Sequence, residues 1–270
     1  MFKDECVMER RRKRSPLQIM QDTVYALFIR ELRTRFGGSR LGYFWAIAEP
    51  AGQAAIMAGI FSLLGRSSIS GVEVGLFMVT SLLTFKLFNK ILTQTANAVQ
   101  ANKGLMSYRQ VEPIDPVITR VIIELVTYIC VLFLLCVLMA WVLGYEVLPA
   151  FPLQLIGAIG LLTLLSLGIG LLLCSLVEYW ADTPKLLTVV MTPMLFVSGV
   201  FYPASVVPKH YWYLINWNPV FHCLELMREA YFDVYYAGFG SWTYVISLTL
   251  LFLSLSLSLY HVNRSRFIGG

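Results

Sequence analysis

Six apolar runs of about the length that crosses the hydrocarbon core of a bilayer constrain this chain more than any other feature. A membrane-spanning helix needs roughly 17–25 apolar residues to cross ~30 Å of hydrocarbon. The runs occupy residues 43–64, 74–91, 117–143, 153–176, 186–201 and 242–260. The fifth is short and contains Pro193 and Gly199, so we expect it to bend or end early. With 57% hydrophobic and 14% charged residues among 270, the chain holds more apolar surface than a soluble domain of this size can bury. The sequence therefore predicts an all-α integral membrane protein with six transmembrane helices in residues 43–260.

The distribution of basic residues predicts how these runs are oriented. An even number of spans places both termini on the same side of the membrane. If that side is the cytoplasm, all but three of the 21 Lys and Arg residues lie in inner segments, and the exceptions are Arg66, Lys209 and Arg228. Because cytoplasmic loops carry an excess of Lys and Arg, we expect cytoplasmic tails at residues 1–16 and 261–270. The basic run 10–14 is a topology signal or a contact for anionic lipid headgroups.

Residues 17–42 predict an amphipathic helix that lies in the inner interface rather than crossing the membrane. Apolar residues recur there at helical spacing, and basic residues, including Arg33 and Arg35, gather toward the C-terminal end, where cations suit the helix dipole. The pair at 37–38, Gly-Gly, then turns the chain into the first span. Tyr43 and Trp45 follow at headgroup depth, as aromatic belt residues do.

The cytoplasmic loop 93–116, between the second and third runs, has the pattern of a docking element. Pro113 and Pro116 prevent a continuous helix through its second half. Residues 101–108 can still form a short helix that presents Lys103, Tyr108 and Arg109 to a soluble partner. An ordinary connecting loop is the alternative interpretation.

The outer segment 202–240 is too long and too apolar for a plain loop, yet too short to span the membrane twice. Asn218 is a good N-cap and Pro219 a good first helical residue, which predicts two short helices separated at this point. One face of the second carries polar side chains, His222, Glu225 and Glu229, with Arg228 beside them. We expect a re-entrant hairpin whose acidic face lines water or a dimer axis. The alternative is an interfacial helix whose carboxylates face the periplasm.

The sequence lacks the common motifs of an ATP-binding, metal-binding or catalytic site. No G-x-x-x-x-G-K-[ST] phosphate loop occurs, so a partner must bind and hydrolyse ATP if ATP is used. The five cysteines show no paired or metal-ligand spacing, and we predict no catalytic residue, no cofactor and no metal site. A membrane enzyme would group His and acids at one face, and only His222 with Glu225 and Glu229 faintly does so.

Three segments together resemble a known family. Residues 33–50 (RTRFGGSRLGYFWAIAEP), the pattern ANKGL…YR…PID in 101–115 and the pattern WNP…E…RE in 217–229 are similar to the permease subunit of bacterial capsular polysaccharide exporters. These belong to the type-2 permease family of ATP-binding-cassette (ABC) transporters. The resemblance covers nearly the whole chain after the first twenty or so residues.

The resemblance implies a homodimer of six-span subunits that binds two copies of a separate cytoplasmic ATPase, which holds ATP and Mg. Such a complex exports a lipid-linked, usually acidic polysaccharide across the inner membrane toward periplasmic and outer-membrane components, with membrane lipids around it and no nucleic acid partner. Rival functions are an ABC exporter of another glycan, such as O-antigen or teichoic acid, a membrane enzyme acting on lipid-linked sugars, and a secondary transporter.

The resemblance also implies roles for particular residues. Coupling to the ATPase is expected at Arg33, Arg35, Asn102, Lys103, Gly104, Tyr108 and Arg109. The outer gate is expected at Asn218, Pro219, His222, Glu225, Arg228 and Glu229. We place the substrate path at Lys86, Lys90, Tyr43 and Trp45.

The charged residues inside the apolar runs are either part of a substrate path or contacts with lipid headgroups and other helices. Lys86 and Lys90 are spaced i, i+4 on one helix face, where they line an inner vestibule that attracts an anionic glycan or snorkel to the inner headgroups. We interpret Glu49 and Glu124 as polar contacts between helices.

Overall fold

A computed structural model describes residues 15–36, 42–65, 68–106, 108, 111–236 and 238–269. The helices are α1 (Pro16–Phe36), α2 (Gly42–Leu63), α3 (Val74–Ala96), α4 (Ile114–Leu143), α5 (Pro152–Val177), α6 (Thr183–Val197), α7 (Pro219–Tyr231) and α8 (Trp242–Gly269). Short 3-10 helices form η1 (Gln100–Leu105), η2 (Ala204–Val206) and η3 (Lys209–Leu214). A two-stranded antiparallel hairpin, β1 (Ser68–Ile69) and β2 (Val72–Glu73), precedes α3. The basic run 10–14 and the Gly-Gly turn at 37–38 lie outside the described residues.

Each predicted apolar run coincides with one long helix: α2, α3, α4, α5, α6 and α8. In the described part of the chain, α3, α4, α5 and residues 242–264 of α8 are long and apolar enough to cross a membrane, while Ile47–Leu63 and Thr183–Val197 form shorter apolar helices. The prediction of a helical integral membrane protein is confirmed. Among the described residues, the small hairpin is the one β-sheet.

Several helix boundaries differ from those of the predicted runs: α3 continues to Ala96, α6 occupies Thr183–Val197, and α4 and α8 are both longer than predicted. Pro116 lies within the first turn of α4, where a missing backbone N–H costs little, so this helix begins at Ile114 rather than 117. At the other end of the chain α8 continues to Gly269, through residues 261–269 that we expected to form a tail. No Pro or Gly interrupts the sequence before Gly269, and the helix therefore has no local reason to end earlier.

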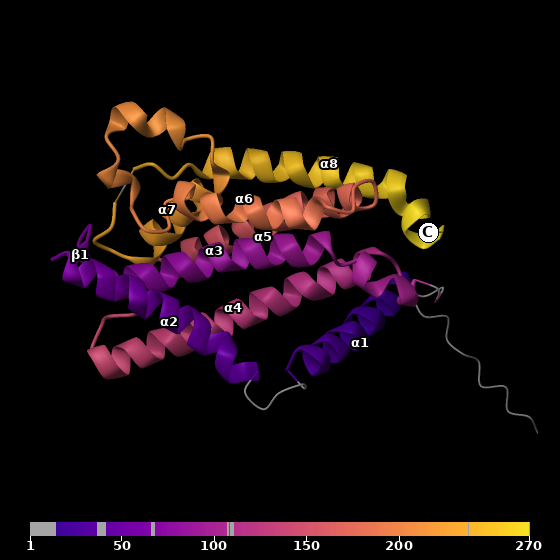
Figure 1. Cartoon of the computed structure of the whole chain (residues 1–270), viewed down its shortest axis with the longest axis horizontal. Coiled ribbons are helices and arrows are strands. Elements are labelled where there is room, and N and C mark those ends of the chain that lie inside the picture. Colours follow the sequence, from indigo (N-terminus) through magenta and orange to yellow (C-terminus); the bar gives the residue numbers. More distant parts are fainter. Residues whose placement is uncertain are drawn as a thin grey trace, which may run out of the picture.

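Helix α3 is the centre of the molecule. It lies between the other long helices in Figure 1 and packs against α2, α4, α5, α6 and α7. In the most apolar segment of α3, 78% of the residues are buried inside the molecule, whereas in that of α8 the share is 17%. The exposed surfaces of α4 and α8 are rich in Leu, Val and Ile, as expected for faces that contact lipid.

The bundle has two distinct ends in Figure 1. The β1–β2 hairpin and α7 lie at one of them, called here the α7 end. Helix α1 and the C-terminal part of α8 lie toward the other, called the α1 end. Helix α1 packs mainly against α4 and buries Leu27 while Tyr25 on the same helix is 68% exposed.

Candidate functional site

The predicted docking loop contacts α1 directly. The Arg30 guanidinium of α1 donates a hydrogen bond to Oδ1 of Asn102 in η1. The Asn102 amide in turn donates to the Ala98 carbonyl (2.8 Å), and its side chain is 4% exposed. Within the loop, η1 is therefore a short helix held against α1, and this pairing is called the α1–η1 contact.

Three further ion pairs and hydrogen bonds surround the α1–η1 contact. Lys103 lies 3.6 Å from Glu178, which follows α5. Arg120 of α4 lies 3.7 Å from Glu31 of α1 and donates to the carbonyl of Gln94 near the end of α3 (2.9 Å). Helices α1, α3, α4 and α5 thus meet η1 at the α1 end.

The predicted coupling residues divide into one that is structural and several that are accessible. Asn102 is buried in the α1–η1 contact, whereas Tyr108 is 64% exposed. Lys103, Gly104 and Arg33 are also exposed. Arg109 and the side chain of Arg35 lie outside the described part of the chain.

Sequence reasoning missed the residues that hold this region together, which are Arg30, Glu31, Arg120 and Glu178. The position of Arg30, one turn before Arg33 on the same helix, was the available signal. Its partner Asn102 is 72 residues away, and no pattern within either segment identifies the pair.

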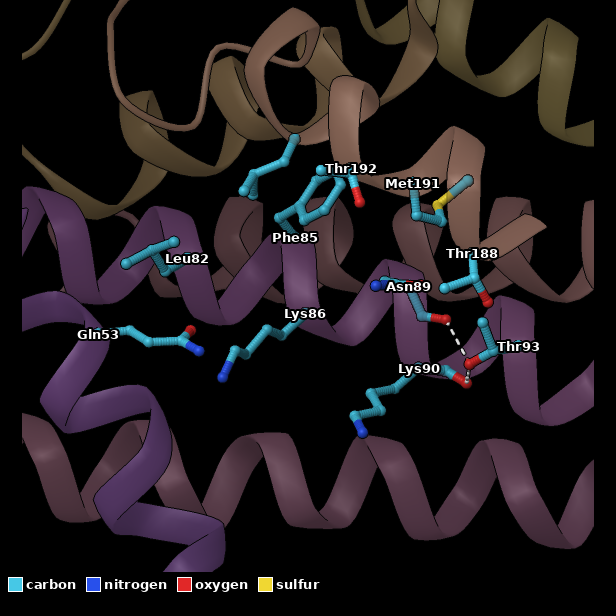
Figure 2. A pocket seen from close by; sticks show the side chains of 11 residues that line it. Gln53, Leu82, Phe85, Lys86, Asn89, Lys90, Thr93, Thr188, Met191 and Thr192 are labelled. Carbon is cyan, nitrogen blue, oxygen red and sulfur yellow. Dashed lines mark hydrogen bonds between the residues drawn. The ribbon is translucent and has the colours of Figure 1, made fainter. Parts of the chain in front are cut away.

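A groove runs between α2, α3 and α6. Its cavity volume is about 390 Å³, and its lining residues are Gln53, Leu82, Phe85, Lys86, Asn89, Lys90, Thr93, Thr188, Met191, Thr192 and Leu195. Figure 2 shows the Lys86 and Lys90 side chains extending from α3 toward the same side, with Gln53 of α2 nearby. Both predicted path lysines therefore line one groove within the helical bundle.

The acidic residues predicted as contacts between helices differ in exposure. The Lys86 ammonium lies 2.8 Å from the Glu49 carboxylate of α2, with side chains 25% and 60% exposed respectively. Glu124 of α4 is 5% exposed. The aromatic part of the predicted path lies elsewhere, because Trp45 is 61% exposed and does not line the groove. The side chain of Tyr43 lies outside the described residues.

Helix α7 begins as its sequence predicts. The Asn218 side-chain oxygen accepts hydrogen bonds from the backbone N–H groups of Val220 (3.0 Å) and Phe221 (3.4 Å), and Pro219 occupies the first turn. The Asn218 amide also donates to the hydroxyl of Ser198 (3.1 Å). The N-cap therefore ties the start of α7 to the end of α6.

A fully buried ion pair anchors α7 inside the subunit. Arg228 and Glu225 are both 0% exposed and lie 2.7 Å apart. The guanidinium donates to the Ser81 hydroxyl of α3 (3.1 and 2.9 Å) and lies 4.3 Å from the centre of the Phe77 ring. It also donates to the carbonyl of Gly199 after α6 (2.6 Å).

The carboxylate of Glu225 is satisfied as fully as the guanidinium. The Tyr235 hydroxyl donates to it (2.7 Å), and so does the backbone N–H of Ala204 (3.2 Å). Hydrogen bonds to both partners offset the cost of burying the charges. We call the set Glu225, Arg228, Ser81 and Tyr235 the α7 anchor.

The α7 anchor differs from the predicted acidic face that lines water or a dimer axis. Glu225 and Arg228 point into the helical bundle because α7 packs against α3 and α5. Glu229, one turn further on, lies at the partly exposed side and accepts a hydrogen bond from the N–H of Gly238 (3.0 Å).

His222 is a buried neutral residue that orders the chain around α7. Its Nδ1 accepts a hydrogen bond from the N–H of Ser241 (3.3 Å), so Nε2 carries the proton and donates to the carbonyl of Asn216 (3.0 Å). The imidazole ring stacks on the ring of Phe239, with 4.7 Å between the two ring centres. Burial lowers the pKa of His222. His222 and Glu225 thus bond to different partners and form no joint acid–base pair.

Comparisons with known proteins agree with this architecture. A family model described as ABC-2 type transporter matches residues 22–232. The polysialic acid transport protein KpsM of Escherichia coli is 37% identical over 252 residues, which cover 93% of this chain and 97% of that protein. The chain therefore belongs to the ABC-2 type transporter family, which confirms the family predicted from the three sequence segments.

More distant relatives have related descriptions. The capsule polysaccharide export inner-membrane protein CtrC of Neisseria meningitidis serogroup A is 23% identical, with 90% of this chain and 91% of that protein covered. The O-antigen export system permease protein RfbA of Klebsiella pneumoniae is also 23% identical, with 91% and 93% covered.

Proposed function

We propose that this chain is the channel-forming permease subunit of an ATP-driven exporter that moves lipid-linked, acidic capsular polysaccharide out of the cytoplasm across the inner membrane. The observation that carries this proposal is the 37% identity, over 93% of the chain, to a polysialic acid transport protein. The lysine-lined groove between α2, α3 and α6 is the matching structural feature, because cations inside a membrane bundle generally serve a pathway.

In this proposal the chain crosses the membrane six times, and both termini lie in the cytoplasm. Helix α2 has 22 residues and rises ~33 Å, enough to cross the hydrocarbon. Helix α6 is shorter, with 15 residues, and a bundle tolerates such a helix where neighbours cover its ends. The basic residues Arg33, Lys103 and Arg120 gather at the α1 end, which supports placing that end inside.

The proposed complex is a homodimer with two ATPase subunits. The groove opens beside α2 and α6 with exposed polar side chains such as Gln53 and Thr192, and lipid tails cannot satisfy these groups. A second copy of the chain would enclose them. ATP and Mg belong to the partner ATPase, while periplasmic and outer-membrane components receive the glycan at the α7 end.

We place the outer gate at α7 and its flanking segments. The α7 anchor joins this helix to α3 and to the carbonyl of Gly199 after α6, so α7 follows any movement of those helices. This linkage supports a gate that opens when the walls of the groove move.

Loss of this chain should leave the lipid-linked glycan inside the cell. In a deletion strain we expect the surface glycan to disappear and a glycan of unchanged structure to accumulate in the cytoplasm, where mass spectrometry identifies it. Complementation with the intact chain is the control. An O-antigen or teichoic acid in the retained fraction selects the rival export function. A glycan of altered structure indicates a membrane enzyme, and export that survives an inactive ATPase contradicts an ABC mechanism.

The ATPase should bind the exposed surface that η1 and Tyr108 present at the α1 end. Tyr108→Ala removes an aromatic side chain that is 64% exposed, and loss of an interface tyrosine typically costs about 1–2 kcal/mol, or roughly a five- to thirty-fold weaker Kd. Titration of the purified ATPase into the full-length chain in nanodiscs measures this. Tyr236→Ala at the α7 end, where Tyr236 is 87% exposed, is the matched control. Equal affinity of the two variants would remove Tyr108 from the interface.

A further inference from the structure

The two cations of the groove differ in their surroundings. Lys86 is paired with Glu49 across α2 and α3 at 2.8 Å. Lys90 lies one turn further along α3 and lines the same groove, and the described residues include no carboxylate within ion-pair distance of its ammonium. The groove therefore carries two positive charges balanced by one negative charge.

The Glu49–Lys86 pair is open to replacement. The Glu49 side chain is 60% exposed, in contrast with the fully enclosed carboxylate of Glu225 in the α7 anchor. An ion pair with such exposure contributes little to stability. An incoming anion can consequently compete for Lys86 without breaking any buried contact.

The spacing of the lysines suits an extended anionic chain. Lys86 and Lys90 are separated by about 6 Å along the axis of α3. Figure 2 shows both side chains on the same side of the helix. Beside the apolar lining residues, Asn89, Gln53 and Thr192 offer amide and hydroxyl groups, which can hydrogen-bond the hydroxyl groups of a sugar. Carboxylates at intervals along a polyhydroxylated chain match this combination.

We propose that Glu49 is a displaceable counterion, and that a carboxylate of an acidic glycan takes its place on Lys86 while also contacting Lys90. This inference rests on the proposed function, because it assigns a subsite and a carboxylate ligand to the same groove. Glu49 holds Lys86 when no glycan is present and weakens glycan binding by competing for it. The glycan therefore binds weakly enough to be released from the two lysines during transport.

The test measures binding to the full-length chain in nanodiscs of phosphatidylcholine. The probes are an oligosaccharide of carboxylate-bearing sugars and its carboxyl-reduced, neutral counterpart. Glu49→Gln should bind the acidic probe about threefold more tightly than the intact chain, as expected when a weak competing pair is removed. Lys86→Gln should bind it more weakly, and Glu49→Gln should give no gain in the Lys86→Gln background. The neutral probe should be insensitive to all of these changes.

The loop after α5 supplies a matched control. Asp182 lies 2.7 Å from Lys185 in an exposed pair outside the groove, so Asp182→Asn removes a comparable carboxylate and should leave probe affinity unchanged. Glu49→Ser serves as a second variant if Glu49→Gln is not recovered folded. Equal affinity of Glu49→Gln and the intact chain overturns the proposal, and so does a gain that persists without Lys86 or that extends to the neutral probe.

Two further results separate this inference from its alternatives. If phosphatidylglycerol in the nanodisc abolishes the difference between the intact chain and Glu49→Gln, the lysines bind lipid headgroups and the glycan subsite is wrong. If the deletion strain retains glycan but Glu49→Gln binds the acidic probe normally, only the counterion fails. If the deletion strain exports glycan normally, the proposed function itself fails.

Discussion

Replacing Arg228 by methionine should destabilise the protein by about 3–5 kcal/mol, because the substitution leaves the carboxylate of Glu225 buried without a countercharge. Both side chains are 0% exposed. The variant also loses the hydrogen bonds to Ser81 and to the carbonyl of Gly199. The free energy of unfolding, measured by denaturant titration in mixed micelles, should fall by this amount.

Two companion variants show whether the charge is responsible. Arg228→Met combined with Glu225→Leu removes both charges and should recover a large part of the lost stability, since a buried pair replaced by apolar residues is often near neutral. Arg228→Lys keeps the charge but cannot reproduce the planar set of donors, and should fall between the intact chain and Arg228→Met. A double variant as unstable as Arg228→Met alone would contradict this account of the α7 anchor.

Gly199→Ala should be similarly damaging, at about 2–5 kcal/mol. Gly199 has φ +69, which costs an L-residue about 1–2 kcal/mol. In addition a Cβ there would overlap the ring of Phe221, and overpacking of a core costs about 1–3 kcal/mol. The same unfolding measurement applies, together with the yield of folded protein in the membrane.

Gly144 allows the two contributions to be separated. It has the same φ of +69, at the C-cap of α4, and a Cβ there would meet nothing within 4 Å. Gly144→Ala therefore reports the backbone cost alone, about 1–2 kcal/mol. Phe221→Leu in the Gly199→Ala background should relieve the clash, so the two changes should be less than additive. Equal losses for Gly199→Ala and Gly144→Ala would show that Phe221 moves aside freely.

The sequence predicted the elements of this fold well because their signals are local. Apolar length indicated all six long helices, and the order Asn218, Pro219 identified the start of α7. Boundaries were less accurate where the sequence holds no clear stop, as at the end of α8. Local patterns suffice for such elements because capping and span length depend on neighbouring residues alone.

The contacts between distant segments could not be predicted in this way. Glu225 and Arg228 are spaced i, i+3, which suggests an ion pair, but nothing in α7 indicates that Ser81, 147 residues away, accepts from the same guanidinium. The carboxylate of Glu225, which we expected to line water or a dimer axis, consequently lies inside the helical bundle. The same limit applies to Arg30 and Asn102, whose contact depends on how α1 lies against the bundle.

Because α3 is central, this one helix contributes residues to the α7 anchor, to the groove and to the surroundings of the α1–η1 contact. Ser81 belongs to the α7 anchor, Lys86 and Lys90 line the groove, and the Gln94 carbonyl accepts from Arg120 beside the α1–η1 contact. Its 23 residues extend ~34 Å without a proline, whereas α2 and α6 contain Pro50 and Pro193. Because α3 has no proline at which to bend, we expect a displacement of α3 at the α1 end to be transmitted to the groove and to α7.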